Sequence, residues 1–204
     1  MTTAIAPHEA KARWRTALFT AVVVVAAAIT GAATTKPLLS LLIDRGAVHN
    51  GPWRTSATTG SAAGNPWEKA AVALAGLYAL TPQEAVYFTA FTDSAGEALR
   101  GECRYRVQGA APPARWWSIT AYDADHYLVR NQAGLYARHA GNLPMSAGGR
   151  FDFALSATAT AETGLPIPVE GPFSLTVRVY NPAPAVLAQL ATLPLPVIVR
   201  EGCP

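Results

Sequence analysis

The sequence predicts a mainly β protein: an antiparallel, jelly-roll-like β-sandwich that follows one N-terminal transmembrane helix, with one or two short helices packed on the sandwich. Three observations support this fold class. An uncharged apolar run lies near the N-terminus, short segments rich in β-branched and aromatic residues fill the rest of the chain, and clusters of Gly, Pro, Asn or Asp separate most of them. With 204 residues, 50% of them hydrophobic, the chain is long enough for one domain with a substantial core.

The apolar run extends from Thr16 to Thr35 without a charged residue. About 20 such residues, at a rise of about 1.5 Å each, cross a hydrocarbon core of about 30 Å. We therefore expect residues 1–15 to form a basic cytoplasmic tail, residues 16–36 a transmembrane signal-anchor helix, and residues 37–49 a linker. Because basic residues precede the run, the positive-inside rule predicts a single pass of the inner (cytoplasmic) membrane, with the following domain in the periplasm. A cleaved signal sequence is the alternative, and it exports the same domain.

The net charge of +3 comes from the first 36 residues. Four basic residues, Lys11, Arg13, Arg15 and Lys36, lie there against one acidic residue, Glu9, so the rest of the chain is neutral. Nucleic-acid binding depends largely on Lys and Arg that neutralise phosphates. A neutral domain without a basic stripe is therefore not expected to bind nucleic acid, and the basic tail is interpreted as a signal for membrane topology.

The β domain is expected to span residues 50–204 and to contain a short helix near its start. Asn65 is a favoured N-cap residue, Pro66 suits the first helical position, and Glu68 lies where a capping box has its acid. The helix should run to about Leu80, because a Thr-Pro pair follows directly.

After this helix the pattern changes to short β-prone segments bounded by turn residues. The predicted strands are Val86–Phe91, Cys103–Val107, Trp116–Tyr122, Tyr127–Val129, Phe151–Leu155, Phe173–Tyr180 and Val197–Val199. Several strands with no helical pattern between them favour an antiparallel sandwich or jelly roll. Residues 187–193 could add one helical turn.

Two long blocks of the sequence are specific enough to compare with known families. Residues 113–123 read PARWWSITAYD, and residues 171–182 read GPFSLTVRVYNP. Together with shorter blocks across residues 50–204, they resemble the bacterial family called domain of unknown function 1214. The resemblance implies a jelly-roll-like β-sandwich. It also implies association with a partner protein of a companion family, domain of unknown function 1254, and it implies no activity. The segment Thr163–Pro168 departs from the family pattern, because it lacks the aromatic residue that many members carry there.

Cys103 and Cys203 are the only two cysteines of the chain. In an exported domain such a pair favours a disulfide. Closing a loop of about 100 residues could stabilise the fold by roughly 4 to 5 kcal/mol in the chain-entropy model. Two unrelated free thiols, or a metal-binding or redox pair, are the alternatives.

Asp123, Asp125 and His126 form the only local cluster of side chains that could bind a metal. The favoured interpretation is a hairpin turn between two strands, where Asp is common because its side chain bonds to nearby backbone groups. No metal site or cofactor is therefore assigned.

Arg115, Trp116 and Trp117 could form a sugar-stacking or cation–π surface. Adjacent residues of a strand point to opposite faces, so one Trp should lie in the core and the other at the surface. A structural role for both rings is the favoured interpretation.

The sequence shows no catalytic constellation. Its acidic residues are scattered, no serine lies in a nucleophile-elbow motif, and no glycine-rich phosphate loop is present. No catalytic residue is assigned, and whether the protein is an enzyme stays open, with a non-catalytic role favoured. The preferred hypothesis is a membrane-anchored binding or assembly module of the envelope that works with the companion-family protein. An enzyme acting on envelope carbohydrate or a small metabolite is the alternative, followed by a purely structural role. The sequence does not specify a small-molecule or glycan ligand.

Overall fold

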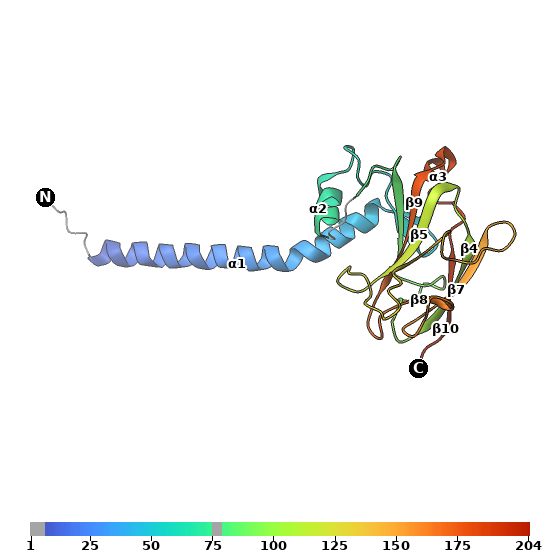
Figure 1. Cartoon of the computed structure of the whole chain (residues 1–204). Helices are drawn as coiled ribbons and strands as arrows, with labels where there is room; N and C mark the ends of the chain where they lie inside the picture. Colours follow the sequence, from blue (N-terminus) through green and yellow to red (C-terminus); the bar gives the residue numbers. More distant parts are fainter. Residues whose placement is uncertain (1–6, 75–78) are drawn as a thin grey trace. The chain divides into compact units, whose positions relative to one another are not determined.

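The computed structural model describes residues 7–74 and 79–204. The chain divides into two compact units, Met1–Arg45 and Gly46–Pro204, and each is described by itself. The first unit is formed by helix α1 (Pro7–Gly46), and the second is the β domain (Figure 1).

Helix α1 contains an apolar segment, Arg13–Thr35, of 23 residues with a mean hydropathy of 2.1. This segment is long and apolar enough to cross a membrane, and a signal sequence near an N-terminus has the same properties. The hydroxyls of Thr34 and Thr35 donate to carbonyl oxygens one turn back, at 2.8 and 2.6 Å, so these polar groups are satisfied within the helix. Residues 37–46, which were expected to begin a linker, continue the helix through Pro37.

The β domain contains two sheets, as predicted for a mainly β fold. The larger sheet has the order β1-β2-β3-β9-β5-β6, and every neighbouring pair is antiparallel. The smaller sheet has the order β10-β4-β7-β8, with β7 and β8 parallel. The strands are β1 (Val48–Asn50), β2 (Trp53–Thr55), β3 (Ala85–Ala90), β4 (Arg104–Ala110), β5 (Ala114–Tyr122), β6 (Ala137–His139), β7 (Arg150–Ser156), β8 (Gly164–Pro166), β9 (Ser174–Pro182) and β10 (Val197–Gly202).

The described residues of the domain include two short helices, α2 (Pro66–Leu74) and α3 (Pro184–Ala188). Helix α2 begins where the sequence predicts, because the Glu68 amide donates to Asn65 Oδ1 at 2.9 Å as an N-cap requires. Its predicted end falls beyond residues 75–78, which lie outside the described residues. Helix α3 begins before the predicted turn at residues 187–193, since Pro184 starts it.

The predicted strand Tyr127–Val129 was wrong. A single bridge joins Tyr122 to Leu128 there, and no strand forms. The reason lies in the preceding turn: Asp123 Oδ1 accepts from the amides of Asp125 and Tyr127, at 3.0 and 2.9 Å, and the chain then leaves the sheet.

The hydrophobic core lies between the inward faces of the two sheets. The larger sheet contributes alternate residues of its three central strands, β3, β9 and β5, and the smaller sheet contributes residues of β4, β7 and β10. Trp117 on β5 stacks on Phe151 of β7, with ring centroids 5.0 Å apart, and so links the two sheets. Because side chains alternate along a strand, the remaining residues of the three central strands point away from this core.

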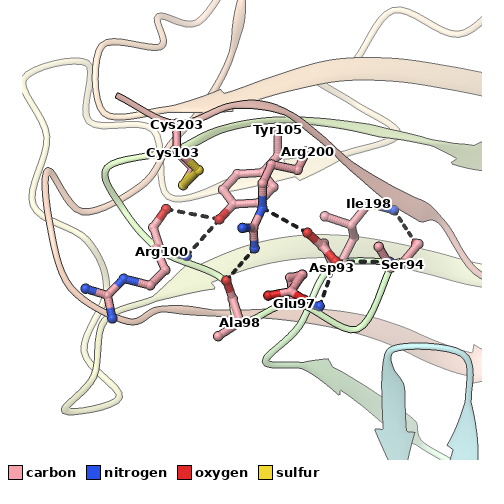
Figure 2. A network of polar contacts seen from close by, with 11 residues as sticks. Asp93, Ser94, Glu97, Ala98, Arg100, Cys103, Tyr105, Ile198, Arg200 and Cys203 are labelled. Carbon is pink, nitrogen blue, oxygen red and sulfur yellow. Dashed lines mark hydrogen bonds and ion pairs between the residues drawn. A yellow bond between two sulfur atoms is a disulfide. The ribbon is translucent and has the colours of Figure 1, made fainter.

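The C-terminal strand β10 is fastened at several points (Figure 2). A disulfide joins Cys203 to Cys103, with the Cα atoms 4.1 Å apart. The edge of β10 that does not face β4 is bonded by Ser94, whose amide donates to the Ile198 carbonyl oxygen at 2.9 Å and whose Oγ accepts from the Ile198 amide at 2.9 Å. This edge is therefore not open for pairing with another strand at Ile198.

A buried carboxylate completes the same network. Asp93 is 2% exposed, and its Oδ1 accepts from the amides of Ala95 and Glu97, both at 3.0 Å. Its Oδ2 lies 3.0 Å from Nε of Arg200 in an ion pair that is not aligned as a hydrogen bond. Arg200 also donates to the Ala98 carbonyl oxygen at 2.7 Å (Figure 2). Asp93 therefore ties the turn after β3 to strand β10.

We expect Asp93→Asn to lower the free energy of unfolding by about 2 kcal/mol. The amide can still accept from the two backbone N–H groups, but its NH₂ group faces the Arg200 guanidinium, where two donors meet. Denaturant unfolding of the full chain in detergent micelles, followed by tryptophan fluorescence, measures the change. Asp125→Asn, in an exposed turn, is the matched control and should stay within about 0.5 kcal/mol of wild type. Equal stability of the two variants would contradict a role for the buried charge.

Candidate functional site

The outward residues of β3, β5 and β9 form one face, which we call the outer face. In the sheet register, Trp116 lies opposite Tyr180, Ser118 opposite Arg178, and Thr120 opposite Thr176. On the other side of β9, Tyr87 lies opposite Arg178 and Thr89 opposite Thr176. The outer face comprises Tyr87, Thr89, Trp116, Ser118, Thr120, Tyr122, Ser174, Thr176, Arg178 and Tyr180. It is thus made of hydroxyl groups and aromatic rings around one arginine.

Arg178 is the only charged residue among these ten. Its Nη1 donates to Thr120 Oγ1 at 2.9 Å, its Nη2 donates to the Tyr122 hydroxyl, and its guanidinium carbon lies 5.3 Å from the centre of the Tyr122 ring. All of these groups are neutral, and no ion pair of Arg178 with a carboxylate is found within the described part of the chain. The half-buried cation is therefore held in place by neutral hydroxyl and aromatic groups.

The hydroxyl residues beneath Arg178 are buried. Ser118, Thr120, Ser174 and Thr176 are each less than 9% exposed, although they point away from the core. Thr176 and Thr89 share a cross-strand hydrogen bond of 3.1 Å between their hydroxyls. These four residues form the buried polar part of the outer face.

Tyr87 adds a further hydroxyl group next to Arg178. Its oxygen accepts from the Leu80 amide at 3.3 Å, and burial raises the pKa of its phenol. The hydroxyl therefore stays protonated at neutral pH and keeps a proton to donate.

Trp116 forms the aromatic end of the outer face. Its ring centroid lies 5.3 Å from that of Tyr180, edge-on, and 5.3 Å from that of His139 on β6. His139 Nδ1 accepts from the Gly141 amide at 3.0 Å, which fixes the imidazole and through it the indole. Trp116 is 40% exposed, whereas Trp117 is 3% exposed and lies in the core. The alternation expected for the Trp pair is therefore seen, with Trp116 at the surface.

The structure separates the other predicted candidates from the outer face. Arg115 is exposed next to Trp116 on the chain, but the cation–π contacts of the described residues involve Arg54, Arg178 and Arg200. Asp123, Asp125 and His126 form the tight turn described above, and His126 has a positive φ of 66°. In the ranges that the structure describes, no group of three or more His, Cys, Asp or Glu side chains could hold a metal ion.

Sequence reasoning missed Arg178, Tyr180 and His139 as site residues. The period-two pattern of residues 173–180 would have placed Arg178 and Tyr180 on one face of a strand. It could not show that this strand pairs with β5, which brings Arg178 next to Thr120, 58 residues earlier in the chain.

Comparison with known proteins places this face within a family. Residues 84–184 match the model of the family described as "Protein of unknown function (DUF1214)". The chain is a member of the DUF1214 family. This confirms the resemblance noted in the sequence. Strands β3, β5 and β9 all lie within the matched residues, so the outer face is part of the DUF1214 region of the chain.

Two crystal structures resemble this DUF1214 protein. The VPA0106 protein from Vibrio parahaemolyticus is 26% identical with a TM-score of 0.54, and the match covers 66% of this chain and 35% of that one. An uncharacterized protein from Burkholderia cenocepacia is 20% identical with a TM-score of 0.41, and the match covers 59% and 30%. The DUF1214 chain thus spans about a third of the length of these relatives. A comparison with curated proteins finds no match.

Proposed function

We propose that this DUF1214 protein is a non-catalytic binding module anchored in the inner membrane, with its β domain in the periplasm and the outer face as its binding surface. The main observation that supports this proposal is the chemistry of the outer face. It offers a fixed arginine, hydroxyl groups and a partly exposed tryptophan, which are groups that recognise a ligand by hydrogen bonding and stacking. None of its ten residues is a carboxylate, and carboxylates in pairs are the usual acids and bases of glycoside hydrolysis.

The proposed topology rests on helix α1. Arg13 and Arg15 stand at the start of its apolar segment, with Lys11 just before them, and the positive-inside rule places such residues in the cytoplasm. Residues 1–15 would then be a cytoplasmic tail and residues 16–36 the anchor, which leaves the domain of residues 50–204 on the periplasmic side.

The proposed partner is a protein of the companion family, domain of unknown function 1254. The family resemblance implies this association. A second observation supports it: the match covers 35% of the Vibrio relative, so most of that chain lies outside the matched part. In that relative the domain is therefore joined to a large amount of additional protein.

Trp116→Ala should reduce partner recovery by about tenfold, because tryptophan is among the side chains that contribute most to the binding energy of interfaces. The tagged full chain is cross-linked in membranes, solubilised and captured, and companion-family proteins are quantified by mass spectrometry. Trp67 on α2 is 52% exposed and is not one of the ten outer-face residues, so Trp67→Ala is the matched control. Failure of the wild-type chain to recover a companion-family protein would overturn the proposed partner. Equal recovery by both variants would overturn the outer face as the interface.

Carbonate extraction tests the anchor. We expect the full chain to stay in the membrane fraction at alkaline pH, because a retained membrane-spanning segment of 23 residues is held by the hydrocarbon core and not by charges. Replacing Val24 by Arg should release part of the protein, since a charge at the centre of a span is costly. Release of the wild-type protein would show that the segment is a cleaved signal sequence.

A further inference from the structure

The charge of Arg178 is the first observation that bears on a ligand. A guanidinium has five N–H donors, and the Thr120 and Tyr122 contacts use two of them. Its contacts within the described residues are all neutral, and a half-buried charge without a counter-ion is costly. A planar guanidinium matches a carboxylate, which can accept two parallel hydrogen bonds from it. The guanidinium donors that are not bonded within the described residues are therefore complementary to a carboxylate from outside the chain.

The position of Trp116 is the second observation. Its indole is partly exposed and is fixed between Tyr180 and His139, so it offers a flat surface of defined orientation. The guanidinium of Arg178 reaches Thr120, four residues along β5 from Trp116. At about 3.3 Å per residue, the stacking surface and the charge are roughly 13 Å apart. One ligand that contacts both must be longer than a single sugar ring.

We propose that the outer face binds an acidic oligosaccharide, with one pyranose ring stacked on Trp116 and the carboxylate of a uronic acid unit on Arg178. This inference rests on the proposed function, because it takes the outer face as the binding surface. An acidic peptide would satisfy Arg178 but does not need a flat aromatic surface at this distance. A sugar chain along β5 uses both features. Residues 37–204, with Arg178 included, carry no net charge, which fits a ligand of low charge density.

The test uses the full chain in detergent micelles and three probes: trigalacturonate, the neutral galactotriose of the same linkage, and triglutamate. Isothermal titration calorimetry measures each affinity. Wild type should bind trigalacturonate about tenfold more tightly than the neutral trimer, because only the former can pair with Arg178. Trp116→Ala should weaken the binding of both sugars.

Two arginine variants separate charge from geometry. Arg178→Lys keeps the charge but loses the two parallel hydrogen bonds, and it should weaken trigalacturonate binding by about tenfold. Arg178→Met should remove the preference for the acidic trimer. Arg104→Met, an exposed arginine on β4 of the other sheet, is the matched control and should bind as wild type does. Unfolding curves for each variant establish that the domain is folded.

Three outcomes would overturn the inference. Equal affinity of wild type for the acidic and neutral trimers would remove the role of the carboxylate. Triglutamate binding as tightly as trigalacturonate would identify an acidic peptide as the ligand. If none of the three probes binds while the companion-family protein is still captured through Trp116, the acidic oligosaccharide is not the ligand. The proposed function as a binding module is then still supported. Failure of both experiments would overturn the proposed function as well.

Discussion

Replacing Cys203 by serine should lower the free energy of unfolding by about 4 kcal/mol, which is one of the two largest effects expected in this protein. The disulfide closes a loop with a sequence separation of 100, and in the chain-entropy model a loop of that length restricts the unfolded state by about that amount. The disulfide lies at the start of β4 and the end of β10, since Gly202, the last residue of β10, pairs with Arg104, the first residue of β4. Its loss should therefore also loosen the last residues of β10.

Cys203→Ser isolates the bond better than Cys103→Ser does. Cys103 is buried, so a serine there would add the cost of an unpaired buried hydroxyl, whereas Cys203 is exposed. Unfolding of the full chain in detergent micelles is compared for oxidised wild type, reduced wild type and the variant. The last two should agree. Alkylation of the native full chain, followed by mass spectrometry, provides the direct check, and two modified thiols would contradict the bridge.

The strands that the sequence predicts well are those with a strong pattern of their own. Residues 86–91, 116–122, 151–155 and 173–180 are rich in β-branched and aromatic residues and are bounded by turn residues, and each contributes to a strand. Strands β1, β2, β6 and β8, of three residues each, were not predicted. Strand β8 even contains Gly and Pro, which are unfavourable in strands, so its place is decided by its neighbours and not by its own sequence.

The candidate site could be predicted only in part. Alternation separates Trp116 from Trp117, and it places Ser118, Thr120 and Tyr122 on the Trp116 face. The cross-strand neighbours depend on which strands pair and in which register, and a single sequence does not contain that information in a local pattern. This is why the turn at Asp123 was singled out by its residue types, while Arg178 became visible only in the folded sheet.

The second large effect is expected for Arg138→Met. Arg138 on β6 is 2% exposed, and its guanidinium donates to four carbonyl oxygens of loops and of strand β8. They are those of Gly164 (2.6 Å), Ala161 (2.6 Å), Asn142 (2.9 Å) and Thr160 (3.3 Å). Because β6 belongs to the larger sheet and β8 to the smaller, this side chain links the two sheets at one end.

The methionine variant should lose about 3 kcal/mol of unfolding free energy, because the buried Gly164 carbonyl oxygen loses its bonds to Arg138 and a buried unpaired group costs about 1 to 3 kcal/mol. The loss of the bonds to Asn142, Thr160 and Ala161, which are partly or fully exposed, should add less. Burial lowers the pKa of the Arg138 guanidinium from its ordinary value, so the charge is costly to bury. The site nevertheless requires an arginine, because a guanidinium has five N–H donors in a fixed planar arrangement. Arg138→Lys should therefore recover only part of the loss, since one ammonium cannot reach all four carbonyl groups.

Amide hydrogen exchange shows which part of the domain the Arg138→Met substitution destabilises. Exchange should accelerate at Gly164 and at Ala154, whose amide donates to the Thr163 carbonyl oxygen at 3.3 Å, before it accelerates in β5 or β9. Arg150→Met, at an exposed position on β7, is the matched control and should change stability by less than about 0.5 kcal/mol. If Arg138→Met unfolds as wild type does, the bonds of Arg138 do not hold β8 in place, and its pairing with β7 is sufficient.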